Sequence, residues 1–337
     1  MTENHINLSA GEISSLWTNY MNDTMSKNIL GFMLQYVEDT DIKPVLQFAY
    51  DSSVYHLNHL EQLFNEEGFA IPNGFSDEDV NMDAPWLFTD VFCITFVTHM
   101  ASTALIAYGG FLRISSRKDI RDFFSESISG TINLYNLASD VTDSKGINAK
   151  FPYITPPSET SYIDSKKYLS GLNPFDEKRP LNAIEVSHLY MNVLTNSIGS
   201  YICMAFAQTT TNEEVKDYML RLKDISQKHL QVLTETLFKN DMETPRIPDV
   251  AISESTTETF SNKLMMFLVN MLTSTGFGNY AASAATSLRM DIALNYERLS
   301  LEIAKIMKSG ADIMIKNGWM EQPPTTPDRN QLANKKN

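Results

Sequence analysis

The 337-residue sequence has little of several features that mark common protein classes. It has two cysteines, Cys93 and Cys203, each within an apolar run, so no disulfide framework is indicated and a reducing compartment is expected. Strand-like alternation of apolar and polar residues is almost absent, which argues against a mainly β fold. The sequence contains no phosphate-binding loop, dinucleotide-binding glycine motif or nucleophile elbow. The reactions that depend on these motifs are therefore not indicated.

Positive charge is also scarce. The formal net charge is −14, which argues against binding to nucleic acid or to anionic lipid. The N-terminal stretch MTENHINLSAGE lacks the basic and then apolar pattern of a signal peptide, so a cytoplasmic location is expected. Residues 86–112 are apolar enough to span a bilayer, but Asp90, His99 and a glycine pair favour a core helix instead. We therefore predict no membrane insertion.

The sequence is an internal duplication. The two halves align with a shift of 173 residues at first and of 172 residues after one deletion. Matched pairs are Leu8 and Leu181, Glu12 and Glu185, Asn19 and Asn192, Asp51 and Asp224, Ser53 and Ser226, His56 and His229, Phe88 and Phe260, Tyr108 and Tyr280, Arg117 and Arg289, and Gly146 and Gly318. A register that continues through most of each half indicates two copies of one domain.

Each copy is predicted to form four long helices. In the first copy they cover about 9–38, 41–67, 85–112 and 115–144, and in the second about 182–210, 212–240, 255–284 and 287–317. Long helices with one longer crossover between the second and third are typical of ferritin-like bundles. The fold prediction is all-α, with two tandem ferritin-like four-helix bundles. The predicted organisation is a first bundle at 1–148, an extended proline-containing linker at 149–180, a second bundle at 181–320 and a polar tail at 321–337.

Glutamates at the helix starts are the first candidates for metal ligands. Glu12 and Glu185 occupy the third helical position of capping boxes, where a glutamate bonds to the backbone of its own cap. A di-iron site needs a Glu-x-x-His motif on two helices, and only Glu185 to His188 fits. Further candidates have no equivalent in the other copy; these are Asp122, Glu126 and His99. A complete di-iron ligand set is therefore not expected, and no catalytic residue or cofactor is predicted.

Histidines on the second helix of each copy are the remaining candidates. His56 and His229 occupy the same place on an apolar stripe. We interpret them as core histidines that bond to a neighbouring asparagine, Asn19 or Asn192, or to a serine, and a metal ligand is the alternative. His59 is three residues from His56 and could share a metal ion with it. Val232 replaces it in the second copy, so we predict a surface or edge residue.

Both copies together resemble the DUF3231 family of Bacillus and relatives. The duplicated unit, the Arg-x-Asp-Ile start of each fourth helix and the ending IMIKNGWMEQPPTTPDR carry the resemblance. That family is ferritin-like and of unknown function, and it is similar to the spore coat protein F family. The resemblance implies the fold and a link to sporulation. In the first copy Ile147 follows Gly146 where the family motif has tryptophan, which puts equal roles for the two copies in doubt.

Three functions remain open on the sequence. The first is a non-enzymatic structural or interaction protein of the spore, which binds coat components or copies of itself and is deposited on the spore. The second is a degenerate ferritin-like protein that binds a metal ion or a small molecule through His56 and His229. The third is a redox enzyme with an unconventional site, which the missing ligand set disfavours.

Overall fold

The chain forms two four-helix bundles joined side by side. The computed structural model describes residues 6–173, 178–245 and 251–334, and within these ranges the regular structure is helical. The first bundle comprises α1 (Ala10–Tyr36), α2 (Ile42–Glu66), α3 (Asp90–Arg113) and α4 (Lys118–Ser144). The second comprises α5 (Ala183–Thr209), α6 (Glu213–Phe238), α7 (Asn262–Thr286) and α8 (Met290–Lys316), and a short α9 (Arg329–Asn334) follows. The predicted all-α fold with two tandem bundles is confirmed; the finer ferritin-like label stays a prediction.

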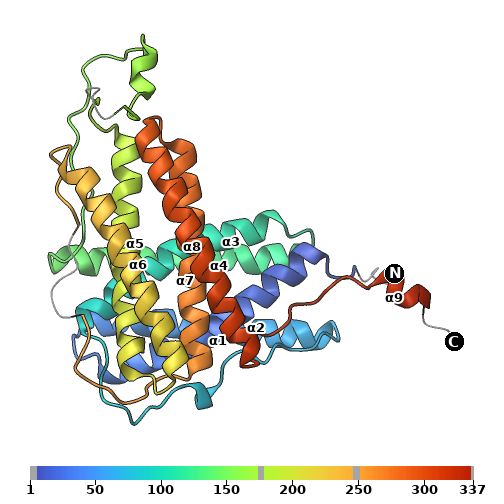
Figure 1. Cartoon of the computed structure of the whole chain (residues 1–337). Helices are drawn as coiled ribbons and strands as arrows, with labels where there is room; N and C mark the ends of the chain where they lie inside the picture. The colour runs from blue at the N-terminus through green and yellow to red at the C-terminus, as the bar shows by residue number, and fades with distance from the viewer. Residues whose placement is uncertain (1–5, 174–177, 246–250, 335–337) are drawn as a thin grey trace.

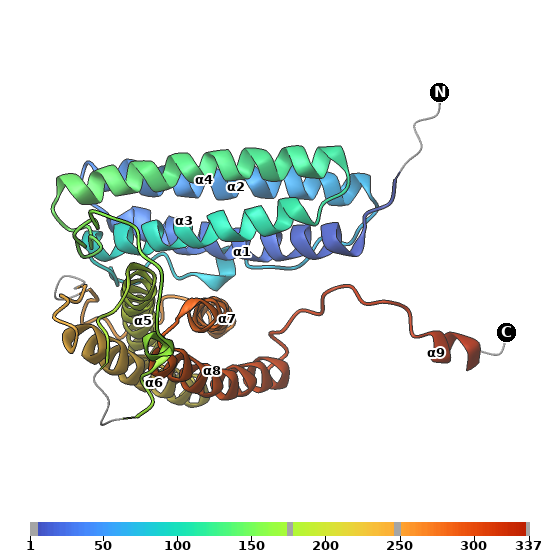
Figure 2. The same ribbon diagram turned by 90° about the horizontal axis from the view of Figure 1, so that it is seen from above.

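The two bundles cross each other rather than lying end to end. The helices of the first bundle run in a clearly different direction from those of the second, and the tail with α9 extends away from both (Figures 1 and 2). One apolar cluster includes residues of both bundles, such as Phe32 and Phe92 with Phe206 and Phe260. The rings of Phe32 and Phe260 lie 5.3 Å apart. Burial of this shared surface stabilises the pair of bundles as one body.

The crossover loops of the two bundles, residues 67–89 and 239–261, pair with each other. Isolated antiparallel bridges join Val80 to Phe260 and Phe88 to Ile252, and each is the image of the other under the 172-residue shift. Four backbone hydrogen bonds follow the same symmetry, from Asn81 to Thr259, from Ser253 to Leu87, from Ser261 to Asp79 and from Thr89 to Ala251. The same patch therefore meets itself from both copies, as in a twofold homodimer.

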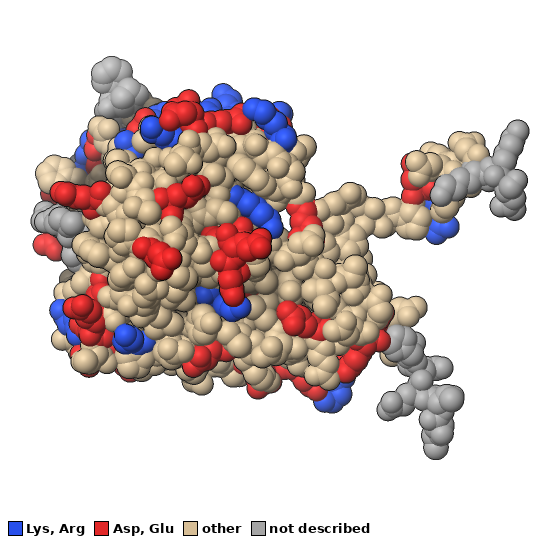
Figure 3. Space-filling view, turned by 90° about the horizontal axis from the view of Figure 1, so that it is seen from below, with Lys and Arg blue, Asp and Glu red and all other residues tan. Residues whose placement is uncertain are grey.

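The apolar α3 lies partly within this shared core. Among the described residues it is the one helix long and apolar enough to cross a bilayer. Its buried residues include Phe92, Ile94 and Val97, which belong to the common cluster. These contacts support the core-helix interpretation of this segment. The expectations of no membrane insertion and of no nucleic-acid binding stay predictions; on the face shown in Figure 3 acidic and basic side chains lie interspersed.

Candidate functional site

The core histidine of the first bundle bonds to an acid and a tyrosine. His56 is buried, and its Nδ1 lies 3.2 Å from Asp23 Oδ2 and 3.4 Å from the Tyr108 hydroxyl oxygen. The prediction that Asn19 or a serine bonds to this imidazole was therefore wrong. Asn19 and Asp23 are four residues apart on α1, and the ring reaches the later turn. Ser53 bonds instead to the carboxyl group of Asp23.

The second bundle repeats this arrangement with two exchanges. His229 Nδ1 lies 3.0 Å from the Tyr280 hydroxyl, which accepts a hydrogen bond from Asn196 Nδ2 at 2.7 Å. Asn196 is the equivalent of Asp23, so an amide replaces the acid. His229 Nε2 lies 3.4 Å from Oε2 of Glu302, whose equivalent is Gly130. Each imidazole thus has one carboxylate beside it, on opposite ring nitrogens in the two bundles.

Burial and charge act differently on the two carboxyl groups. Burial raises the pKa of Asp23, and the hydrogen bonds from His56 and Ser53 offset this only in part. Burial also raises the pKa of Glu302, but Lys228 and His229 more than compensate and bring it below its ordinary value. Desolvation lowers the pKa of His229. The acid of the first bundle is therefore the one held in a dry environment.

Few metal-ligating side chains lie around the two histidines. Within the described parts of the chain no three or more His, Cys, Asp and Glu side chains are grouped to hold a metal ion. His56 has one carboxylate neighbour and so does His229, whereas a zinc or iron site uses three or four protein ligands. The metal alternative for these two histidines stays a prediction.

A cavity of about 150 Å³ lies inside the first bundle next to this histidine. All four helices of the bundle line it, together with Met271 of α7. Its polar lining residues include Asn19, Asp23, His56 and Tyr108; its apolar ones include Phe96, Val97, Met100, Phe111 and Leu134. An engineered apolar cavity of about this size is known to bind benzene. The space is therefore large enough for a small ring compound.

The second bundle is filled at the equivalent place. The corresponding cavity measures about 50 Å³. Small residues that line the first cavity are replaced by larger ones in the second copy: Ala49 by Leu222, Ser52 by Ile225, Ser127 by Leu299, Gly130 by Glu302 and Thr131 by Ile303. These positions lie on the second and fourth helices of each copy. These substitutions on two helices reduce the space in the second copy, whereas on the third helix Phe111 is replaced by the smaller Ser283.

Asn19 in the first bundle lacks the hydrogen-bond acceptors that its equivalent, Asn192, has in the second. Asn192 Nδ2 donates to the His188 carbonyl and to Ser283 Oγ, at 2.8 and 2.9 Å. Asn19 is 2% exposed and its Nδ2 has no partner in the described part of the protein. The equivalent of Ser283 is Phe111, which offers no acceptor. A buried donor is thus left unpaired at the wall of the cavity, at a cost of about 1–3 kcal/mol.

The capping glutamates serve structure, as predicted. Ser9 and Asn182 cap α1 and α5 in complete capping boxes with Glu12 and Glu185. Each glutamate also accepts a hydrogen bond from the start of the fourth helix of its bundle, Glu12 from the Ser116 and Arg117 amides and Glu185 from the Arg289 amide. This double use explains why both acids are buried and recur.

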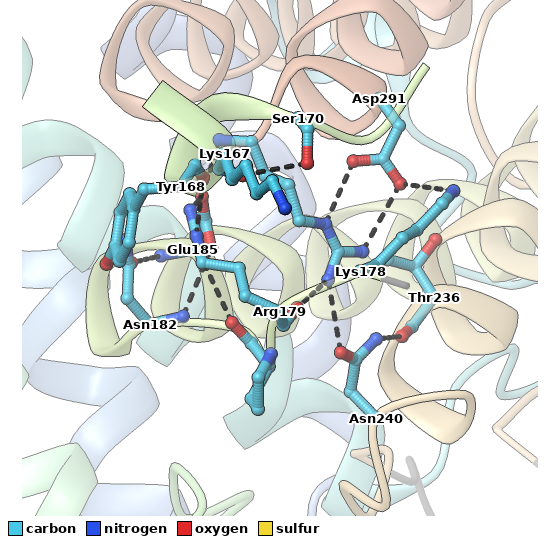
Figure 4. Close-up of polar contacts among 12 residues, drawn as sticks. Lys167, Tyr168, Ser170, Lys178, Arg179, Asn182, Glu185, Thr236, Asn240 and Asp291 are labelled. Carbon is cyan, nitrogen blue, oxygen red and sulfur yellow. Dashed lines mark hydrogen bonds and ion pairs between the residues drawn. The ribbon is translucent and has the colours of Figure 1, made fainter. Parts of the chain in front are cut away.

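Around Glu185 the segment between the bundles adds further contacts. Arg179 Nη2 lies 2.7 Å from Glu185 Oε1, and the guanidinium stacks over the Tyr168 ring at 3.9 Å. Lys178 and Asp291 lie beside this pair, 2.9 Å apart (Figure 4). The cluster fastens the linker to the second bundle, and its side chains are already paired with one another. It is therefore not a candidate binding site.

The remaining candidates from the sequence have local partners, except His99. His59 stacks on Phe123, with ring centroids 4.6 Å apart. Asp122 pairs with Lys118, and Glu126 accepts from Tyr55. His188 contacts Ser283 Oγ at 3.1 Å, apart from the Glu185 cluster. His99 Nε2 is buried without a partner in the described residues, and it does not line the cavity.

Comparison with known proteins places this architecture in a family. A model of the DUF3231 family, described as proteins of unknown function, matches residues 1–159 and 169–332. The chain belongs to the DUF3231 family. The two matched regions correspond to the two bundles, so this DUF3231 protein contains the family unit twice. The resemblance inferred from the sequence is thereby confirmed.

A solved structure is also similar to part of the DUF3231 chain. It is a protein from Bacillus halodurans C-125 named a "putative spore coat protein", with 20% identity and a TM-score of 0.42. The match covers 44% of this chain and 98% of that one. No curated protein matches the chain.

Proposed function

We propose that the first bundle binds a small, mostly apolar molecule in its cavity, and that the second bundle is a closed structural copy. The supporting observation is the paired substitution of small residues for large ones around His56, which leaves about 150 Å³ empty in one copy only. This is the small-molecule form of the core-histidine hypothesis from the sequence, restricted to one copy.

The energetic cost of the cavity supports this proposal. At about 24 cal/mol per Å³, a cavity of about 150 Å³ lowers stability by about 3–4 kcal/mol. Asn19 adds the cost of an unpaired buried donor. The second bundle shows that the same fold accommodates Leu299 and Ile303 at these positions. A bundle with a purely structural role has no need to keep the space open, whereas a ligand that fills it recovers the cost.

Association with the spore is a second proposal, which concerns the location of the protein and not its ligand. The resemblance to spore-coat-like families supports it, as does the name of the similar protein from Bacillus halodurans. Deposition on the spore, binding to coat components and self-association all stay predictions. They are compatible with a ligand-binding bundle, since binding uses the interior of the first copy and docking would use its surface.

Calorimetric titration of the full chain with benzene, toluene and phenol tests the binding proposal. We expect saturable binding of at least one of them at one site per chain, with a rise in melting temperature. The double variant Ser127→Leu/Thr131→Ile introduces residues of the second copy and is expected to abolish binding. Ser129→Leu, on the exposed side of the same helix, is the matched control. The proposal fails if none of the compounds binds, or if the filled variant binds as well as the wild type.

A further inference from the structure

We infer that the ligand of the first bundle is a neutral aromatic alcohol or phenol, whose hydroxyl group meets Asn19, Asp23 and His56 at the polar end of the cavity. This inference rests on the proposed function and specifies its ligand class. The second bundle has side chains of its own at the positions where the ligand would bind in the first.

The two bundles differ in which polar atoms are already bonded. In the second bundle Glu302 accepts at His229 Nε2, and Ser283 accepts from Asn192 Nδ2. In the first bundle both oxygens are missing, because Gly130 and Phe111 occupy those positions. Asn19 Nδ2 has no partner, and His56 bonds through Nδ1 among the described residues. A ligand oxygen would accept from Asn19 Nδ2, as Ser283 Oγ accepts from Asn192 Nδ2 in the second bundle.

Charge then selects among oxygen-bearing ligands. Asp23 is buried and already lies beside the one imidazole of the cavity. A carboxylate ligand would place a second acid beside that imidazole. The second bundle avoids such a pair of acids: Glu302 lies beside its imidazole, and the equivalent of Asp23 is the neutral Asn196. An ammonium ligand would be buried beside the carboxyl group of Asp23. Burial raises the pKa of this group, and it already bonds to His56. A neutral hydroxyl avoids both costs, since it accepts from Asn19 Nδ2 and donates its proton to Asp23.

The rest of the lining selects a flat apolar body. Away from the polar end, the cavity wall is formed by aromatic and aliphatic side chains, among them Phe96, Val97 and Leu134. A cavity of this volume holds about one six-membered ring.

Competition among benzene, phenol, benzoate and benzylamine at pH 7 tests the ligand class by calorimetric titration. Phenol is expected to bind at least about tenfold more tightly than benzene, as one net hydrogen bond of about 1.4 kcal/mol requires. Benzoate and benzylamine are expected to bind more weakly than phenol. Asp23→Asn, which introduces the residue of the second copy, and Asn19→Leu should each reduce the affinity for phenol relative to that for benzene.

The outcomes separate this inference from the proposed function. Equal binding of benzene and phenol, or tightest binding of benzoate or benzylamine, would overturn the ligand class while the cavity remains a binding site. A preference for phenol that survives both variants would also overturn it. If neither benzene, toluene nor phenol binds, the proposed function itself fails. Circular dichroism checks folding, and should one variant fail to fold, the other still decides the result.

Discussion

The two bundles share a backbone plan and differ inside. Both keep a core histidine bonded to a tyrosine of the third helix, His56 with Tyr108 and His229 with Tyr280. The second bundle provides Ser283 for Asn192 Nδ2 and Glu302 for His229 Nε2, and it places Leu299 and Ile303 in its core. The first bundle leaves a cavity and an unpaired amide. Once a duplication has provided one well-packed copy, the other is free to keep costly features, as a binding site requires.

The largest effect is expected from a substitution that creates a cavity in the second bundle. Leu299 is fully buried, so Leu299→Ala is expected to lower the free energy of unfolding by about 2–5 kcal/mol through lost burial and a new cavity. Denaturant unfolding followed by circular dichroism measures the change. Leu301→Ala, at a position that is 67% exposed, is the control and should cost much less. A small loss at Leu299 would show that the second bundle is not tightly packed.

The capping acids give the next largest effect, in both bundles. Burial raises the pKa of Glu12 and of Glu185, but the hydrogen bonds they accept outweigh it and the pKa of each is lowered. A lowered pKa stabilises the folded state above about pH 4.5, the ordinary value, and that stability is lost as the pH falls further. Glu185→Gln should therefore cost about 1–3 kcal/mol at pH 7 and less at pH 3.

Melting temperatures between pH 3 and pH 7 measure this loss. Glu12→Gln should behave alike, although Arg179 makes Glu185 the more sensitive of the two. Glu213→Gln, at an exposed glutamate in the first turn of α6, is the control. A cost that does not change with pH would contradict the assignment of the effect to the ionised carboxylate.

The predictable part of this molecule is the part that both copies repeat. The helix starts at Ser9 and Asn182 follow from local capping chemistry, so the sequence alone placed them within a residue or two. The repeat likewise singled out His56 and His229. The repeat does not show their partners: Tyr108 and Tyr280 are a matched pair, but alignment alone does not reveal that they contact the histidines, and Asp23 and Asn196 differ between the copies. The cavity was missed for the same reason: it arises from non-identical pairs such as Ser127 and Leu299, which the repeat also aligns.

A substitution that fills the cavity of the first bundle tests the same difference between the copies in the opposite direction. Ser127 is buried, and its hydroxyl donates to the Phe123 carbonyl of its own helix. That carbonyl also accepts the backbone hydrogen bond of the helix, so it stays paired when the hydroxyl is removed. Ser127→Leu places apolar atoms in the cavity and is expected to stabilise the chain by about 0.5–2 kcal/mol while it removes ligand binding. Chemical unfolding and titration with phenol measure the two effects. Destabilisation would mean that the cavity cannot accept a leucine and that the match between the copies is imperfect.

The smallest effect concerns the acid that the second bundle lacks. Because burial raises the pKa of Asp23, its contribution to stability is fully present below its ordinary pKa and is lost as the pH rises through the folded value. Asp23→Asn keeps a hydrogen-bonding group beside His56 and cannot ionise. Relative to the wild type, the variant should gain up to about 1 kcal/mol between pH 4 and pH 8, the net worth of one hydrogen bond.

Thermal unfolding across this range measures the difference in slope. Asp51→Asn, at an exposed position on α2, provides the matched charge change without the burial. Ligand should reverse the gain, since a hydroxyl bound at Asp23 stabilises the wild type and is not held as well by the variant. Parallel slopes for both proteins, with and without phenol, would mean that the carboxyl group of Asp23 is not the feature that distinguishes the two bundles.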